Sequence, residues 1–242
     1  MSGKTDIDID WNSPIVNQIM EIKEYNKFIH NPRFVKESVR MFKNPWIEVF
    51  SRTPWYMVPI IWTPTSLFLF ASGARCVPNV LLSTFAFSFG VFVWTLLEYV
   101  LHRFLFHIDL EKLRNLVGGH TTQLGKLLTI THFCMHGVHH SMPCDPLRLV
   151  FPPVLSGMIL GFIYGGLRII SLFPVKWIDI VVSGILFGYT LYDTMHYMLH
   201  YHRDIKIGYF LTMKRYHMHH HFRDSGRGFG ITSKLWDSCF AT

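Results

Sequence analysis

The sequence predicts an all-α membrane protein with four transmembrane helices and a helical cap on one side. Half of the 242 residues are hydrophobic and only 16% are charged, well below the roughly 25% that is typical of soluble domains. Long segments without a charged residue recur along the chain. Most of the fifteen histidines, in contrast, lie in tight clusters between or after those segments. We expect a single domain over residues 1–242.

The first part, residues 1–52, is polar and contains no apolar run of the kind found in secretory signal peptides. We therefore expect the first hydrophobic segment to be an uncleaved anchor. Apolar residues alternate with basic ones from residue 10 to residue 51. Short amphipathic helices in the membrane interface and a solvated tail are both compatible with this pattern.

Three segments without charge follow, at residues 53–74, 76–97 and 149–167. Each has about the 20 residues that a helix needs to cross the hydrocarbon. A fourth segment, residues 177–192, contains Asp179 and is weak by itself. It becomes a credible span as the return arm of a hairpin with the third, joined through residues 173–175. Two membrane hairpins, 53–97 and 149–192, are therefore predicted.

The distribution of basic residues predicts the topology. Four passes place residues 1–52, the 98–148 loop and residues 193–242 on one side, which carries 20 of the 23 Lys and Arg residues. The opposite side has Arg75, Arg168 and Lys176. The positive-inside rule then places the large loops and both termini in the cytosol. The net charge of +7 reflects this topology, with some attraction to anionic membrane lipid, and no stripe or reading motif indicates nucleic-acid binding.

Four histidine clusters lie on that cytosolic side. At helical spacing, positions i, i+3 and i+4 share a face, so the members of the last three clusters are expected to point the same way within each cluster. The first pair is five residues apart, about 140° around an α-helix, and need not share a face. The clusters are His102/His107, His136/His139/His140, His196/His200 and His217/His220/His221.

Neutral imidazole is a common metal ligand, and ten imidazoles exceed what one ion of ordinary coordination number requires. The sequence therefore predicts a cap that holds a histidine-rich dimetal site with these ten ligands. The five other histidines are expected to have no part in it: His30, His120, His132, His202 and His219. The four cysteines are widely spaced, without a zinc-finger or disulfide pattern, and are expected to be reduced thiols.

Carboxylates are scarce near the clusters. Glu98 precedes His102 by four residues and Asp193 precedes His196 by three. Each either orients its neighbouring imidazole or is an ordinary charge on a helix surface, and both possibilities stay open. No arrangement for hydrolysis is present, and no catalytic acid or base separate from the metals is expected. Ligands so close to the membrane favour redox chemistry on lipid C–H bonds, for which iron is suited.

At this point the chain resembles the sphingolipid fatty acid 2-hydroxylases of the fatty acid hydroxylase superfamily, membrane relatives of the sterol oxidases and desaturases. The resemblance covers almost the whole chain. Besides the four histidine clusters it rests on the segments Ile9-Asp10-Trp11, Asn44-Pro45-Trp46-Ile47-Glu48, Thr53-Pro54-Trp55-Tyr56, residues 148–153 (RLVFPP), residues 228–233 (GFGITS) and Trp236-Asp237.

The resemblance implies a multi-pass enzyme of the endoplasmic reticulum that uses oxygen to hydroxylate carbon 2 of a long acyl chain, free or within ceramide. It implies two metal ions on the same ten histidines, iron for activity and zinc possible in purified protein. Electrons would come from cytochrome b5 and its NAD(P)H-dependent reductase. The fused cytochrome b5 domain of many relatives is expected to be absent, and the family's adjacent histidines are His200-Tyr201-His202 here, which leaves the role of His202 open.

Residues 109–130 resemble an insertion, and Gly118-Gly119 indicates an exposed loop there. Two other functions stay open. One is oxidation or desaturation of a different lipid, such as a sterol or a sphingoid base. The other is a non-catalytic membrane zinc protein for storage, transport or scaffolding.

Overall fold

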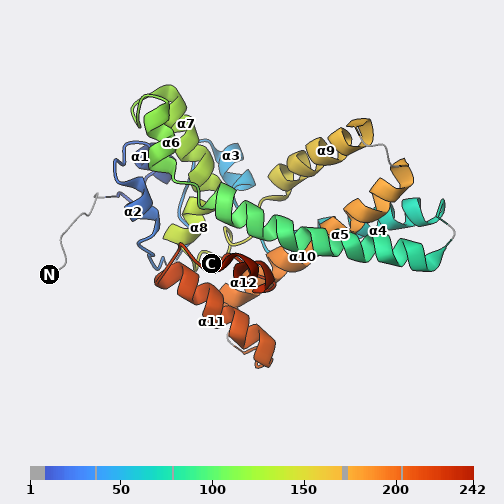
Figure 1. Cartoon of the computed structure of the whole chain (residues 1–242). Coiled ribbons are helices and arrows are strands. Elements are labelled where there is room, and N and C mark those ends of the chain that lie inside the picture. The colour runs from blue at the N-terminus through green and yellow to red at the C-terminus, as the bar shows by residue number, and fades with distance from the viewer. Residues whose placement is uncertain (1–8, 36, 78, 171–173, 203) are drawn as a thin grey trace.

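The computed structural model describes residues 9–35, 37–77, 79–170, 174–202 and 204–242, and within these ranges it contains helices and no strand (Figure 1). The all-α prediction is therefore confirmed. Four helices are long and apolar enough to cross a membrane, as predicted: Met57–Ala74 (α4), Val80–Val100 (α5) with its continuation to Phe106, Pro153–Ile170 (α9) and Val175–Tyr201 (α10). They extend together from a cap formed by the other helices (Figure 1).

Helix α10 is the centre of the membrane bundle and packs along both α4 and α5. Glycines bring the backbones together: a Cβ on Gly184 would lie 2.1 Å from the carbonyl oxygen of Phe87, and the Cα atom of Gly90 would be 3.0 Å away. Small residues permit such close approach between membrane helices. The polar Asp179 is buried in the bundle, where it accepts a hydrogen bond from Tyr164 at 2.6 Å. The weakest predicted span is thus the most enclosed.

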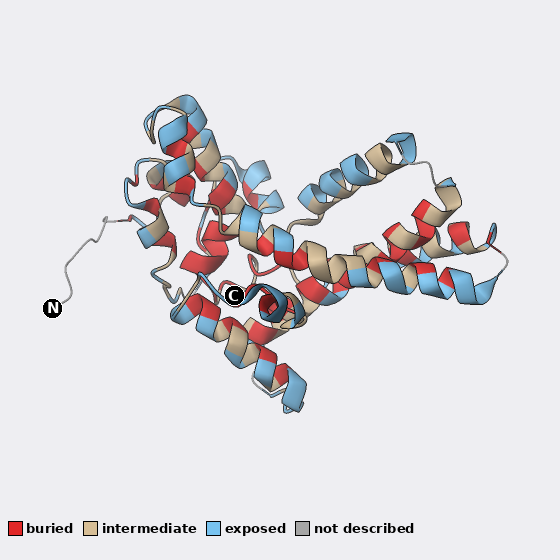
Figure 2. Ribbon diagram, in the orientation of Figure 1, coloured by how far each residue is buried: buried red, intermediate tan, exposed pale blue. Residues whose placement is uncertain are grey.

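Helix α9 has the opposite environment. It contains no buried residue, and Figure 2 shows it in blue and tan beside the red positions of α10. It leaves the cap after residue 152 and meets α10 at its far end (Figure 1). Of the predicted connection at 173–175, residue 173 lies outside the described residues.

Two membrane helices run further than their predicted ends at residues 97 and 192. Helix α5 continues directly into a π-helix, Leu101–Phe106 (η1), and α10 reaches Tyr201. The first and third histidine clusters therefore begin on extensions of membrane helices instead of on loops. No glycine or proline interrupts either extension, so the helical hydrogen bonds continue.

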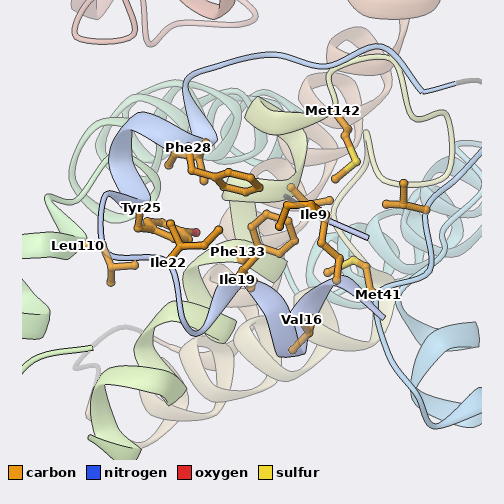
Figure 3. Packing of buried hydrophobic residues seen from close by; sticks show 14 residues of the cluster. Ile9, Val16, Ile19, Ile22, Tyr25, Phe28, Met41, Leu110, Phe133 and Met142 are labelled. Carbon is orange, nitrogen blue, oxygen red and sulfur yellow. The ribbon is translucent and has the colours of Figure 1, made fainter. Parts of the chain in front are cut away.

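The N-terminal segment is neither a tail nor mainly an interfacial layer. Helices Ile15–Ile19 (α1) and Tyr25–Ile29 (α2) bury their apolar side chains in the core of the cap, around Phe133 (Figure 3). Only helix Pro45–Phe50 (α3), capped by the Asn44 side chain, keeps an exposed apolar face, with Trp46 76% exposed. The interfacial prediction therefore applies to α3 alone.

The insertion at 109–130 is a helical hairpin, not an extended loop. Helices Leu110–Leu116 (α6) and Gln123–His132 (α7) are joined at Gly118 and Gly119, whose φ angles of 91° and 94° favour glycine. The buried Arg114 donates to the carbonyl oxygens of Ile22 and Lys23, at 3.1 and 2.8 Å. The hairpin is thereby tied to the N-terminal segment and forms part of the cap.

Four further elements complete the cap. They are Phe133–Gly137 (η2, a second π-helix), Val138–Ser141 (α8), Gly208–Phe222 (α11) and Leu235–Phe240 (α12).

Candidate metal centre

The ten clustered histidines converge on two groups of five. In each group, one ring nitrogen from every member lies within 4.8 Å of the others. The first group is His102, His107, His136, His140 and His220, and the second is His139, His196, His200, His217 and His221. These are the ten residues that the clusters predicted as ligands, and the five remaining histidines belong to neither group.

Helix η1 explains how His102 and His107 meet. On an α-helix they would point about 140° apart, but the chain is π-helical from Leu101 to Phe106. The amide of His107 donates to the carbonyl of His102 at 3.1 Å, the i→i+5 bond of a π-helix. This wider turn brings residues five apart back to one side. No feature of the local sequence predicts this π-helical turn.

The members of a cluster do not all serve the same group, although the i, i+3, i+4 spacing predicted a common direction. His136 and His140 belong to the first group, while His139 between them belongs to the second. In α11 the pattern is reversed: His217 and His221 belong to the second group and His220 to the first. Positions i and i+4 share a group, and the intervening histidine lies far enough around the helix to reach the other.

The nitrogen positions fit bound cations. The Nε2 atom of His107 lies 3.2 Å from that of His136 and 3.0 Å from that of His220. The Nε2 atom of His217 is 2.8 Å from that of His200 and 3.0 Å from that of His221. One ring nitrogen cannot form both hydrogen bonds at once, because it carries either one hydrogen or one lone pair. Nitrogens about 2.1 Å from a shared ion and at roughly right angles lie about 3 Å apart.

Unpaired nitrogens support the same interpretation. Among the described residues, both ring nitrogens of His139 and of His140, and Nε2 of His102, are buried without a hydrogen-bond partner. A buried polar atom left unpaired costs about 1–3 kcal/mol. Metal ions would satisfy one nitrogen of each of these rings. The donor set, all imidazole, suits iron, zinc, copper or nickel.

Backbone carbonyls orient several of the ten imidazoles. His102 Nδ1 lies 2.5 Å from the oxygen of Phe229, His196 Nδ1 lies 3.0 Å from that of Leu149, and His220 Nδ1 lies 2.7 Å from that of Arg227. A carbonyl accepts only, so each Nδ1 carries the hydrogen. The Nε2 lone pair of each ring is then available to a metal.

Among the described residues, neither Glu98 nor Asp193 forms a hydrogen bond to an imidazole, and both are buried, so neither is a surface charge. Both hold the loops that supply those carbonyls. Glu98 accepts from the amides of Ile231 and Thr232, at 2.6 and 2.7 Å. Asp193 accepts from the amide of Phe151 at 3.0 Å, two residues beyond Leu149. Each carboxylate therefore holds a loop whose carbonyl oxygen bonds to a grouped histidine.

Sequence reasoning missed a third carboxylate with this role. Asp237 accepts from the amides of Phe229 and Gly230, at 2.9 and 2.7 Å. A Cβ on Gly230 would lie only 2.8 Å from the Asp237 carboxylate, so glycine permits this approach. The proximity of Trp236-Asp237 to the GFGITS segment was the available indication.

The electrostatic environment favours neutral imidazoles. Burial lowers the pKa of His136, His140, His217 and His221 well below its ordinary value, and neighbouring histidines lower it further. At neutral pH these rings are therefore uncharged and able to bind a metal. His132 differs, because both its nitrogens are already paired, with the Tyr25 hydroxyl and the Phe106 carbonyl, at 2.9 Å each.

An apolar cavity of about 580 Å³ reaches the two groups from the membrane side. Its wall near the site includes His136, His139 and His196, and its far wall is made by α9, including Ile159 and Ile163. These two isoleucines are also about half exposed on the bundle surface. The cavity therefore connects the histidine groups with the surface that faces lipid.

The model of the fatty acid hydroxylase family matches residues 87–242, and the relatives agree with it. Rat fatty acid 2-hydroxylase is 38% identical over 97% of this chain, and Arabidopsis thaliana dihydroceramide fatty acyl 2-hydroxylase is 38% identical over 80%. The chain spans 64% of the length of the rat protein and 76% of the plant protein.

A solved structure of full-length scs7p, in which only the hydroxylase domain is visible, superimposes with a TM-score of 0.85 at 36% identity. The superposition covers 97% of this chain and 84% of the other. The predicted resemblance is confirmed at the level of the family. A matched domain that includes all ten grouped histidines, together with relatives alike in sequence and fold, shows that this chain belongs to the fatty acid hydroxylase family.

Proposed function

We propose that this protein hydroxylates carbon 2 of the long acyl chain of a sphingolipid such as ceramide, with O2 as the oxidant. The observation that carries the proposal is the apolar cavity that joins a lipid-facing helix to both histidine groups. Relatives named fatty acid 2-hydroxylase and dihydroceramide fatty acyl 2-hydroxylase support this chemistry and substrate class. The whole of residues 1–242 would form one hydroxylase domain.

The ten histidines would hold two metal ions, five for each ion in the groups given above. Iron is expected in the active enzyme, and zinc can replace it during purification because it binds nitrogen sites more tightly than Fe(II). When bound, iron supplies the activation of O2 that oxidation of an unreactive C–H bond requires. The protein itself would bind the acyl chain, orient it and exclude water from the site.

The cavity lining indicates how the chain would be bound. Apolar side chains of α9, α10 and α5 would surround the acyl chain and exclude water from it. Phe106, whose ring stacks on His136 with 5.0 Å between centroids, narrows the cavity beside the first group. Polar side chains also line the cavity, among them Arg148 and Tyr189. The polar part of the lipid would remain near the histidine groups while the chain extends toward α9.

The lipid would reach the cavity from within the bilayer. Residues of α3 and α9 line the cavity and are also exposed at the surface, among them Phe50 and Val154. A long-chain lipid therefore has no need to cross water to reach the site. This route fits a substrate whose chains already lie in the membrane.

The enzyme would lie in the endoplasmic reticulum membrane with both termini in the cytosol. The basic residues support this orientation, because most of them lie on the side of the cap. The histidine groups would then be on the cytosolic side. There cytochrome b5, reduced by its NAD(P)H-dependent reductase, would supply the electrons.

The decisive experiment is reconstitution of the purified protein with iron, reduced cytochrome b5 and a ceramide of defined chain, with the product position assigned by mass spectrometry. His140→Ala should lower metal content and abolish 2-hydroxyceramide. His219→Ala is the matched control, because His219 is exposed on α11 and outside both groups, and it should retain activity.

Other outcomes would replace the proposal. Oxidation of a sterol or a sphingoid base, with ceramide unchanged, would identify a different lipid oxidase. Absence of O2 uptake with every lipid, in protein that contains its full complement of metal, would favour a non-catalytic zinc protein.

A further inference from the structure

A second cavity reaches the first histidine group from the cap. Its volume is about 330 Å³ and its lining includes His107 and the polar side chains of Asn26, His30, Arg103 and Asp109. Phe106 lines both this cavity and the apolar one. The Phe106 side chain therefore lies between the apolar cavity and this more polar one, beside the first histidine group.

His30 is the unexplained residue of this polar cavity. It belongs to neither group, yet its ring stacks on His107 with 5.8 Å between centroids and lies edge-on to His140 at 5.2 Å. Its Nδ1 atom is 2.8 Å from the carbonyl oxygen of Asn26. Since a carbonyl only accepts, Nδ1 carries the hydrogen and Nε2 has a free lone pair.

That lone pair lacks a donor. The Nε2 atom of His30 is shielded from solvent and has no hydrogen-bond partner among the described residues. Among the charged groups that line the cavity, Asp109 pairs with Lys112 at 2.9 Å, and the Arg103 guanidinium, which donates to the Tyr99 hydroxyl, would repel a cationic donor. A neutral donor small enough for the cavity fits best, and water meets both conditions.

The proposed reaction, on which this inference rests, requires such a polar route. One oxygen atom of O2 enters the C–H bond and the other leaves as water, which consumes two protons and two electrons from the one-electron carrier. Titratable side chains such as Glu98, Asp193 and Tyr189 also line the apolar cavity, but an acyl chain that fills the cavity would exclude the water needed to connect them with the cytosol. Protons and product water would then need a separate path between the cytosol and the metals.

We infer that the polar cavity is this path, and that His30 positions a water molecule in it beside His107 and His140. His30 acts as a hydrogen-bond acceptor: Nε2 receives one hydrogen of the water, whose other hydrogen-bonding positions face the cavity. The residue is a positioning residue and does not bind metal. His132, which also lines the cavity, cannot take this role because both its nitrogens are paired.

The test compares His30→Phe with His30→Gln in iron-loaded enzyme. Phenylalanine keeps a ring but has no acceptor, whereas the glutamine amide oxygen reaches about as far as Nε2. Both variants should retain two metal ions and the thermal stability of the wild type. His30→Phe should release hydrogen peroxide in place of product and show at least a twofold larger solvent isotope effect in D2O. His30→Gln should restore both values toward the wild type.

A direct structural measurement accompanies the kinetics. An experimental structure of the wild type should contain an ordered water within hydrogen-bond distance of His30 Nε2, and this water should be missing from His30→Phe. Loss of metal in His30→Phe, or an ion bonded to Nε2, would show that His30 is a ligand. Unchanged coupling and isotope effect in His30→Phe would also overturn the inference.

Failure of the proposed function gives a different result. In that case the wild type itself consumes no O2 with ceramide and reduced carrier. The water at Nε2 still tests the site then, because its presence depends on the cavity and not on turnover.

Discussion

Helices α9 and α10 are consecutive in the chain and similar in hydropathy, with mean values of 1.6 and 1.3, but they occupy opposite environments. The more apolar helix, α9, has no buried residue, whereas more than half of the residues of α10 are buried. The reason is that α10 uses glycines, hydroxyls and a carboxylate to contact other helices. Hydropathy thus identifies segments that cross a membrane, and of these two helices the more apolar one is the one that faces lipid.

The strongest test of this comparison places the same large side chain in each helix. Gly184→Leu in α10 would drive a side chain into the backbone of Phe87, with at least the roughly 1–3 kcal/mol cost of overpacking. We expect poor accumulation, a lower melting temperature and loss of metal in detergent-purified protein. Gly161→Leu in α9 is the control, because a Cβ there meets nothing within 4 Å. Equal damage by both substitutions would contradict the difference between the helices.

A smaller effect is expected from the carboxylates of α10. Asp193→Ala removes the acceptor of the Phe151 amide, which frees the loop that orients His196. Metal affinity should fall by about 10–100-fold, measured by competition with a chelator, and Asp193→Asn should restore part of it. Asp179→Ala is the matched control, since this second buried carboxylate lies 14 residues away on the same helix and bonds to α9. If the Asp179 variant loses metal as readily, the loop does not carry the effect.

The smallest effect concerns two faces of α9 alone. Ile159 lines the apolar cavity, whereas Phe162 is 85% exposed and does not. Ile159→Trp should reduce kcat/KM for very long acyl chains by about tenfold relative to shorter ones, without a change in melting temperature. Phe162→Trp should leave this ratio unaltered. A shift of the ratio by Phe162→Trp, with none by Ile159→Trp, would mean that the acyl chain lies on the other side of the helix.

The sequence predicts much of this molecule, since three spans follow from their charge-free lengths, the fourth from its pairing in a hairpin, and the ten grouped histidines from their clustering along the chain. The pairing of His102 with His107 does not follow, because it depends on a π-helical turn for which the local sequence has no marker. The division of His136, His139 and His140 between two groups could not be predicted from the sequence either. It depends on the positions of α10 and α11, which supply the other members of each group.

The central place of α10 and the composition of the cap were missed for a related reason. A charged residue such as Asp179 argues against a membrane span in the sequence alone, because its hydrogen-bond partner Tyr164 is identified only in the structure. In the same way, α1 and α2 carry too few residues to indicate by pattern that they cover Phe133. The burial of α10 and the packing of α1 and α2 both depend on contacts between distant segments, which cannot be inferred from a single sequence.

The sharing of both histidine groups by α8 and α11 has a consequence for metal uptake. Helix α8 contributes His139 and His140 to different groups, and α11 contributes His220 to one group and His217 and His221 to the other. If both groups bind metal as proposed, an ion in one group would fix the backbone that carries donors of the other. We therefore expect the two ions to be taken up cooperatively and half-loaded protein to be scarce.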